Sequence, residues 1–114
     1  MGKPVAGDVV IVPFPFSNLT DTKRRPALVL ASLDGNDVVL CMITSQSIHD
    51  RYAIPLAAQD FASGSLPVAS NIRPSRIFTA DAGIIVRVVG RLREEKLSQV
   101  RKSLTQLLTE SDQP

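Results

Sequence analysis

The stretch Asp34-Gly35-Asn36-Asp37 joins two apolar runs, residues 26–31 (PALVLA) and 38–44 (VVLCMIT). Asp-Gly and Asn-Asp are turn-forming pairs, and short runs rich in Val, Ile and Leu favour strands, so this segment predicts a β-hairpin. Another strand is predicted at residues 8–12, where four β-branched residues follow one another. The polar segment 17–25 between these strands is predicted to be a loop.

Four further strands are predicted at residues 52–56, 65–72, 76–79 and 84–91. Pro55 places the first of them at a sheet edge, because proline cannot donate a hydrogen bond to a neighbouring strand. Short strands separated by turns roughly every 8–12 residues are typical of a small barrel or sandwich. The sequence therefore predicts a mainly β domain.

The apolar spacing changes near the C-terminus, where an α-helix is predicted. Apolar residues recur there at spacings of 3, 4, 3 and 1, at Leu97, Val100, Leu104, Leu107 and Leu108. This spacing places them on one face of a helix. Glu94 and Glu95 fall in its first turn, where the helix dipole favours acidic side chains. No Ser, Thr, Asp or Asn directly precedes them as a cap, so the pattern leaves the first residue of the helix open.

The composition bounds what this chain of 114 residues and 12.3 kDa can be. Hydrophobic residues make up 44% and charged residues 21%, which predicts one folded domain, residues 1–110, with a frayed tail at 111–114. One cysteine, Cys41, and one histidine, His49, cannot form an internal disulfide or a Cys/His zinc site. No apolar run reaches the roughly 18 residues of a membrane span, and residues 1–7 lack the features of a signal peptide, so we expect a cytoplasmic protein.

Arginine supplies nine of the 13 basic residues, although the formal net charge is only +2. A guanidinium group binds phosphate in a bidentate manner that lysine cannot reproduce, so this bias favours a phosphate-bearing partner. The alternative is that the arginines solvate the surface and pair with the 11 acidic residues. The densest basic group is Lys23-Arg24-Arg25, and Pro26 forces Arg25 into an extended conformation where a loop is predicted to meet a strand.

Ile43-Thr44-Ser45-Gln46 ends the second strand of the predicted hairpin with hydroxyl and amide side chains. These groups can contact phosphate oxygens or base edges, or they can close the strand through local hydrogen bonds. Cys41 fits a small core residue within an apolar run. His49 fits either a solvated loop residue or a general base.

Five short motifs, taken in order, resemble the MazF/PemK family of toxin endoribonucleases. They are Gly7-Asp8-Val9-Val10, Arg25-Pro26-Ala27-Leu28-Val29-Leu30, Ile43-Thr44-Ser45, Thr79-Ala80-Asp81 and Val89-Gly90-Arg91-Leu92. The resemblance covers about residues 5–108 and rests on the whole series, since no single motif is long. It implies a small SH3-like barrel with a C-terminal helix, the MazF/CcdB-like fold, assembled as a two-fold dimer.

The resemblance also implies an activity. A member of this family is the toxin of a toxin–antitoxin pair and inhibits translation and growth by cleaving single-stranded RNA at short sequences, without a metal or another cofactor. The 2′-hydroxyl of the RNA is the nucleophile, so the products carry 2′,3′-cyclic phosphate and 5′-hydroxyl ends. Arg25 and Thr44 match the family's catalytic positions. The implied partners are single-stranded RNA and an antitoxin with an acidic segment.

Contacts with the RNA are expected around this catalytic pair, at Lys23, Arg24, Ser45, Gln46, Arg73, Arg76 and Phe16. Arg73 matches a further family arginine if that stretch is aligned without gaps, and Arg76 is the alternative assignment. Ser75 stands where some relatives carry an aspartate, and the loop before Arg25 lacks a histidine that some relatives have. The resemblance therefore does not tell which bases this chain recognises or which of its residues act as general acid and general base. Phe14 and Phe16 fit either stacking on bases or filling the core.

Two alternatives come from different functional classes. CcdB toxins share the implied fold and inhibit DNA gyrase by binding, without cleaving nucleic acid. They act through residues of the C-terminal helix, for which this chain shows no matching signature, whereas Arg25 with Thr44 favours the ribonuclease. The second alternative is an inactive RNA-binding relative, which the presence of the motif residues disfavours.

Overall fold

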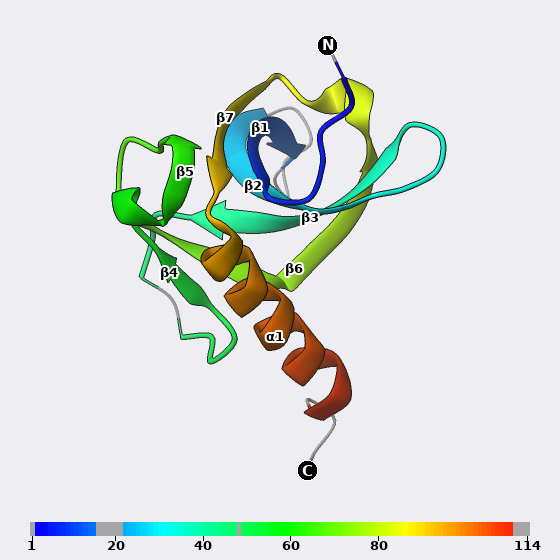
Figure 1. Ribbon diagram of the computed structural model, residues 1–114. Coiled ribbons are helices and arrows are strands. Elements are labelled where there is room, and N and C mark those ends of the chain that lie inside the picture. The colour runs from blue at the N-terminus through cyan, green and yellow to red at the C-terminus, as the bar shows by residue number, and fades with distance from the viewer. Residues whose placement is uncertain (1, 16–21, 48, 111–114) are drawn as a thin grey trace.

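The computed structural model describes residues 2–15, 22–47 and 49–110. The strands are β1 (Asp8–Pro15), β2 (Thr22–Ser32), β3 (Asp37–Thr44), β4 (Ile54–Leu56), β5 (Phe61–Gly64), β6 (Ser70–Asp81) and β7 (Arg87–Leu92). Short 3-10 helices span Ala58–Asp60 and Ala82–Ile84, and helix α1 spans Glu94–Glu110 (Figure 1). The tail at 111–114 lies outside the described residues.

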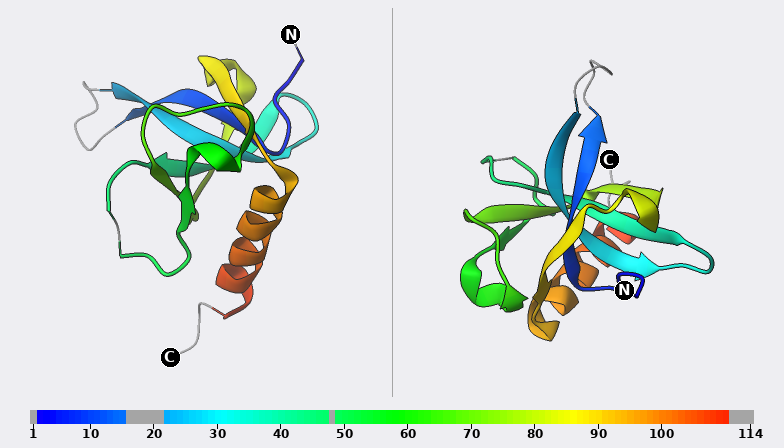
Figure 2. Two further views of the ribbon diagram at one scale, coloured as in Figure 1. Left: turned by 60° about the vertical axis from the view of Figure 1, so that its left-hand side comes forward. Right: turned by 90° about the horizontal axis from the view of Figure 1, so that it is seen from above.

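The seven strands form one antiparallel sheet in the order β4-β6-β3-β2-β1-β7-β5. The sheet curls on itself into an incomplete barrel with β4 and β5 as its two edges (Figure 1). Helix α1 follows β7 and extends away from the sheet, as the left view of Figure 2 shows. The predicted fold class, mainly β with a small curled barrel and a C-terminal helix, is confirmed.

The sheet buries side chains on both faces, which is why its central strands read as continuous apolar runs. The first cluster contains Val9, Leu28, Cys41, Ile43, Ile54, Leu56, Phe61, Ile72, Leu92, Leu97 and Val100. The second cluster contains Val10, Val12, Ala27, Val29, Val38 and Leu40. Consecutive residues of β1, β2 and β3 alternate between the two clusters, as the two-residue period of a strand requires. The two clusters therefore mark the two faces of the sheet.

Helix α1 covers the first cluster with only the N-terminal half of its predicted apolar face. Leu97 and Val100 are buried, whereas Leu104 and Leu107 are half-buried and Leu108 is 68% exposed. The helix therefore leaves the sheet before its apolar face ends. Among the described helices, none is both long enough and apolar enough to cross a membrane.

Strand β2 begins at Thr22, so the basic residues 23–25 lie in a strand rather than in the loop predicted at 17–25. The reason is that β1 continues to its last residue as a partner of β2. The prolines of β1 are tolerated because the pairing of β1 with β7 ends at Ile11, which leaves that edge of β1 open. The remainder of the predicted loop, residues 16–21, lies outside the described residues. Figure 2 shows the paired ends of β1 and β2 projecting beyond the rest of the sheet.

The hairpin predicted around Asp34-Gly35-Asn36-Asp37 is confirmed as β2 and β3, with Gly35 at a positive φ of 71°. The strand predicted at residues 52–56 is confirmed over Ile54–Leu56, as β4 at a sheet edge, and residues 52 and 53 lie outside it. The strand predicted at 84–91 begins later, at Arg87, because a 3-10 turn precedes it. The strand predicted at 65–72 is wrong over residues 65–69, which join β5 to β6.

Strand β5 was not predicted from the pattern of apolar residues. Its pairing with β7 depends on glycine residues and not on alternating apolar side chains. Gly64 pairs with Gly90, and a Cβ atom built at Gly64 would lie 2.1 Å from the carbonyl oxygen of Val89. A Cβ atom at Gly90 would lie 2.8 Å from the ring of Phe61. Any larger residue would therefore force the two backbones apart.

Strand β6 merges two predicted strands into one of 12 residues with an irregularity in its middle. Cys41 of β3 pairs with Ile77, but the next residue, Met42, pairs with Arg73. Residues 74–76 therefore have no partner in β3, and we call these three residues the β6 bulge.

Candidate active site

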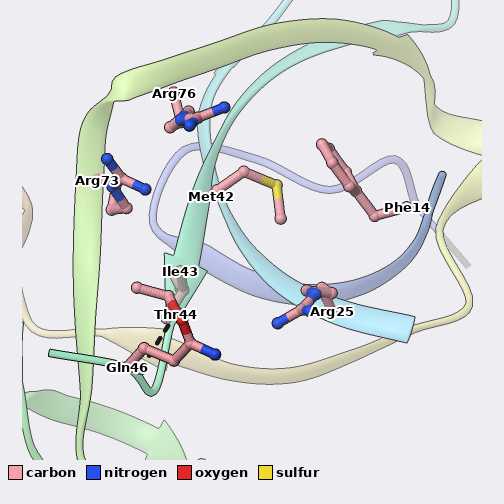
Figure 3. A pocket seen from close by; sticks show the side chains of 8 residues that line it. All are labelled: Phe14, Arg25, Met42, Ile43, Thr44, Gln46, Arg73 and Arg76. Carbon is pink, nitrogen blue, oxygen red and sulfur yellow. Dashed lines mark hydrogen bonds between the residues drawn. The ribbon is translucent and has the colours of Figure 1, made fainter. Parts of the chain in front are cut away.

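A hollow of about 190 Å³ opens on the sheet face that carries the second cluster. We call it the basic hollow; Figure 3 shows the eight residues that line it, Phe14, Arg25, Met42, Ile43, Thr44, Gln46, Arg73 and Arg76. Three of them are arginines, and none of the eight is acidic. The sequence predicted five of these residues as a site, namely Arg25, Thr44, Gln46, Arg73 and Arg76, and the fold brings those five together.

Strand alternation explains why distant residues meet here. Phe14, Arg25 and Thr44 each lie two or four positions from a member of the second cluster in the same strand. The pairs are Val12 with Phe14 in β1, Ala27 with Arg25 in β2, and Leu40 with Thr44 in β3. The basic hollow therefore begins where the apolar residues on this face end.

Arg25 is half-buried and pairs with Val12 in the β1–β2 ladder. It lies within a strand, not at the loop–strand junction that the sequence predicted. The ladder between β2 and β3 extends no farther toward this end than Ala27 paired with Met42, so β2 and β3 separate at Arg25. The guanidinium group occupies this opening and faces the hollow (Figure 3).

Thr44 closes β3 and has an oriented hydroxyl group. Its Oγ1 accepts a hydrogen bond from the backbone nitrogen of Gln46 at 3.2 Å, and the carbonyl oxygen of Gln46 accepts one from Asn71 Nδ2 at 3.2 Å. A hydroxyl group that accepts one bond still has its own hydrogen to donate. The backbone of Gln46 is thus fixed on both sides, and its amide side chain lines the hollow (Figure 3).

Arg73 and Arg76 line the same hollow because of the β6 bulge. Residues three apart point to opposite faces of a regular strand. The bulge reverses this alternation, since Ile72 belongs to the first cluster and Phe78 packs against the second. Both arginines, which the sequence offered as alternatives, therefore face one site (Figure 3).

Apolar side chains complete the hollow; of these, the sequence had offered only Phe14 as a residue that could stack on bases. Met42 and Ile43 line it from β3, and Phe14 lines it from β1. The Phe14 ring meets Phe78 edge-on, with ring centroids 5.9 Å apart. Aromatic and thioether groups beside guanidinium groups suit a nucleobase next to a phosphate.

Asp50 is a neighbour of the site that sequence reasoning missed. Its carboxylate oxygen Oδ2 lies 3.6 Å from Arg73 Nε and accepts a hydrogen bond from the Ser75 hydroxyl, and Oδ1 accepts one from the Tyr52 amide at 2.9 Å. Burial raises the pKa of Asp50, but the bonds from Ser75 and Tyr52 and the charge of Arg73 outweigh it and lower the pKa below its usual value. The carboxylate is therefore charged at neutral pH.

A second hollow, of about 480 Å³, adjoins the basic hollow and shares Arg25 and Ile43 with it. Arg24 and Ser45, both predicted to bind RNA, line this second hollow instead of the first. Arg24 and Ser45 each lie one position from Arg25 or Thr44 in the sequence, so they face the opposite side of the sheet. The predicted binding residues are therefore divided between two faces that meet where β2 and β3 separate.

The remaining candidate residues lie elsewhere. Lys23 is exposed and pairs with Phe14 but lines neither hollow, and Phe16 lies outside the described residues. His49 is exposed and lines neither hollow. Cys41 is buried, as predicted, and this burial raises its pKa to about 12. No group of three or more metal-ligating side chains occurs in the described part of the chain.

A family model for PemK-like, MazF-like toxins of type II toxin–antitoxin systems matches residues 6–108. The chain belongs to this family. The resemblance carried by the five motifs is thereby confirmed. The family match spans the strands that build both hollows and most of α1.

Solved structures with these toxins share the fold. MazE–MazF from Deinococcus radiodurans in crystal form III is 22% identical, with a TM-score of 0.75 over 94% of this chain and 97% of that chain. MazF from the same organism in form I is 23% identical, with a TM-score of 0.74 over 95% and 98%. An endoribonuclease in complex with its cognate antitoxin from Mycobacterial species is 15% identical, with a TM-score of 0.73 over 97% and 99%. No curated protein sequence matches the chain.

For a toxin of this family, the basic hollow supplies specific chemical groups. Arg25, Arg73 and Arg76 can stabilise the negative charge of a phosphate from several directions. Thr44 can donate a hydrogen bond to one of its oxygens. The described lining residues offer guanidinium, hydroxyl and amide groups, which are suited to binding and polarising a phosphate.

Proposed function

We propose that this toxin is an endoribonuclease that cleaves single-stranded RNA at short sequences within the basic hollow. The proposal rests on one observation, the convergence of Arg25, Thr44 and Arg73 on a hollow whose eight described lining residues include no acid. RNA carries its own nucleophile, so the protein needs to align the strand and stabilise charge rather than attack it. Guanidinium groups can provide this stabilisation in a mechanism that requires no metal ion.

In this mechanism the 2′-hydroxyl oxygen attacks the adjacent phosphorus and the bond to the 5′-oxygen breaks. The 2′-hydroxyl loses its proton and the leaving 5′-oxygen gains one, which yields 2′,3′-cyclic phosphate and 5′-hydroxyl ends. Arg25 stabilises the extra negative charge on the pentacoordinate phosphorus, with Arg73 and Arg76 on the other side of the hollow. Thr44 donates its hydroxyl hydrogen to a phosphate oxygen, since Gln46 occupies one of its lone pairs.

Arg25 acts through charge and not as a proton carrier. A guanidinium group keeps its proton at any physiological pH. The eight lining residues include no group whose ordinary pKa is near neutral. The arginines therefore lower the energy of the transition state without exchanging protons with the substrate.

The nucleotides beside the cleaved bond occupy both hollows in this proposal. Gln46 offers an amide and Phe14 a ring to a base in the basic hollow. Arg24 and Ser45 offer polar contacts to the flanking backbone in the second hollow, which adjoins the first at Arg25. Lys23 and Phe16 are also proposed to contact the RNA, on the basis of the sequence alone.

We propose that the toxin works as a homodimer in the cytoplasm and is held inactive by an antitoxin with an acidic segment. The family consists of toxins of type II toxin–antitoxin systems. The second hollow combines Arg24, Arg25 and Arg87 with apolar lining such as Leu66 and Val68, which suits an acidic segment containing apolar residues. Such a segment would cover Arg25 and exclude RNA.

The test is a cleavage assay on a long mixed-sequence RNA in the presence of EDTA, with mapped product ends. Wild type is expected to give discrete cuts, and Arg25→Ala and Thr44→Ala are each expected to slow cleavage by about 10²–10³-fold. Arg101→Ala and Thr105→Ala are matched controls, because both residues are exposed on α1. These controls should cleave at the wild-type rate.

Two outcomes would contradict the proposal. Cleavage by Arg25→Ala at the wild-type rate would remove Arg25 from the mechanism, and cleavage of a strand with 2′-deoxy sugars would exclude attack by the 2′-hydroxyl. Failure of folded wild type to cleave any RNA would favour the CcdB-like alternative. A gyrase supercoiling assay then tests that alternative directly.

A further inference from the structure

Asp50 is held by three groups, one from its own loop and two from β6. Ser75 donates its hydroxyl from the β6 bulge to Oδ2, and the Tyr52 amide donates to Oδ1 at 2.9 Å. Arg73, also in β6, places its Nε 3.6 Å from Oδ2. The Asp50 side chain is only 10% exposed, so its carboxylate is held in a fixed position beside Arg73.

The contact between Arg73 and Asp50 is made by the inner nitrogen of the guanidinium group, Nε. Its Nε is fully buried and has no hydrogen-bond partner within the described residues, so the carboxylate at 3.6 Å is the group that offsets its charge. The side chain as a whole is 24% exposed, and its guanidinium end faces the basic hollow (Figure 3). The contact at Nε therefore holds the inner part of the Arg73 side chain beside Asp50, while Arg73 also lines the basic hollow.

We propose that Asp50 is a positioning residue that holds Arg73 by its Nε side and aims the terminal nitrogens of Arg73 at the phosphate of the bound RNA. Ser75 and the Tyr52 amide fix the carboxylate in the orientation that this requires. The inference rests on the proposed function of the basic hollow, and it assigns a role to a loop residue outside the five family motifs.

The physical reason is that an arginine side chain has many rotamers and loses several of them when it binds a ligand. A carboxylate that fixes the stem removes this entropy cost before the RNA arrives. A displacement of about 1 Å in a group that stabilises the reacting phosphate can cost up to 10²-fold in rate. Loss of the Asp50 charge should therefore reduce cleavage even though Asp50 does not line the hollow.

Asp50→Asn is the informative variant because it keeps the shape of the side chain. The amide oxygen can still accept the hydrogen bond from Tyr52, but the negative charge beside Arg73 Nε is gone. Asp60→Asn is the matched control. Asp60 also accepts a backbone hydrogen bond, from Ala57 at 2.8 Å, and also lies near a cation, with Lys96 Nζ at 3.5 Å.

The experiment is single-turnover cleavage of a defined RNA by wild type, Asp50→Asn, Arg73→Ala and the double variant. We expect Asp50→Asn to reduce the rate at saturating RNA roughly tenfold and to have no further effect once Arg73 is absent. Asp60→Asn should cleave like wild type in both backgrounds. A wild-type rate for Asp50→Asn, or an equal loss with and without Arg73, would overturn the proposal.

A second measurement separates this inference from the proposed function. The measurement is hydrogen exchange at the Nε–H group of Arg73, followed in a nitrogen-15 spectrum without RNA. The signal is assigned by its absence from the spectrum of Arg73→Ala, and its exchange rate shows whether the inner part of the side chain is held in place. We expect slow hydrogen exchange in wild type and fast exchange in Asp50→Asn. Unchanged exchange would contradict the positioning role even if the toxin cleaves RNA, whereas a changed signal in a chain that cleaves no RNA would contradict only the proposed function.

Ser75→Ala keeps the test decisive if Asp50→Asn does not fold. Ser75 is exposed, and its loss removes one hydrogen bond to Asp50 without removing the charge. We expect an intermediate loss of cleavage, about threefold, that again disappears when Arg73 is absent. Full activity of Ser75→Ala together with unchanged exchange at Arg73 Nε would overturn the proposal.

Discussion

Two arginine–aspartate pairs of this toxin use the same chemical groups in different ways. Arg91 donates a terminal nitrogen, Nη1, to Asp8 Oδ1 at 2.9 Å and so ties the end of β7 to the start of β1. Arg73 contacts Asp50 through its inner Nε, at 3.6 Å, and its guanidinium group lines the basic hollow. The nitrogen that the aspartate engages thus distinguishes a structural arginine from one directed at a ligand.

Of the changes to these two pairs, replacement of Arg73 by lysine is expected to have the largest effect. A lysine has one terminal nitrogen, so at position 73 it cannot face both Asp50 and a phosphate. We expect Arg73→Lys to slow RNA cleavage by about 10–100-fold with little change in melting temperature. The measurement is single-turnover cleavage, and Arg91→Lys, whose single nitrogen can still reach Asp8, is the control and should cleave normally.

A smaller effect is expected when the structural pair is removed. Arg91→Ala leaves Asp8 without its charged partner, although Asp8 still accepts a hydrogen bond from the Val5 amide at 3.0 Å. We expect the free energy of unfolding to fall by about 1 kcal/mol, measured by denaturant titration, because the pair is partly exposed to water. Cleavage by the folded variant should stay within twofold of wild type. A large loss of cleavage without loss of stability would erase the distinction between the two pairs.

The smallest effect concerns pH. The pKa of Asp50 lies below its usual value, so its stabilising contribution is complete above the ordinary aspartate pKa of about 4 and is lost only as the pH falls through the lowered value. The difference in unfolding free energy between wild type and Asp50→Asn should therefore be constant from about pH 8 to pH 5 and shrink below about pH 4. Denaturant titrations at these pH values measure it. A difference that already changes between pH 8 and pH 5 would show that the carboxylate is not held in its charged form.

The sequence predicted the parts of the site that depend on local pattern. Arg25 beside Pro26 and Thr44 at the end of an apolar run both line the basic hollow, because strand alternation alone carries them to one face. The hairpin and the C-terminal helix were predictable for the same reason, since turn residues and apolar spacing act over short distances. The positions of these elements within the sheet required the family resemblance.

The rest depended on contacts between distant residues. Asp50 is separated from Ser75 by 25 positions, and no local pattern indicates that the two side chains meet. The β6 bulge arises from a register shift against β3, so the sequence left Arg73 and Arg76 as alternatives although both line the hollow. Arg24 and Arg25 look equivalent in sequence, yet a one-residue offset sends them to opposite faces.

The β6 bulge divides this strand into two segments whose inward and outward alternation is set independently. In the segment before the bulge, the side chains alternate in step with Ile43, which belongs to the first cluster. In the segment after the bulge, they alternate in step with Leu40, which belongs to the second cluster. Removing one residue from positions 74–76 would invert one segment relative to the other, whereas removing two would keep both core faces and move Arg76 along the strand. The length of this interruption therefore sets the distance between Arg73 and Arg76, and with it the size of ligand the basic hollow accepts.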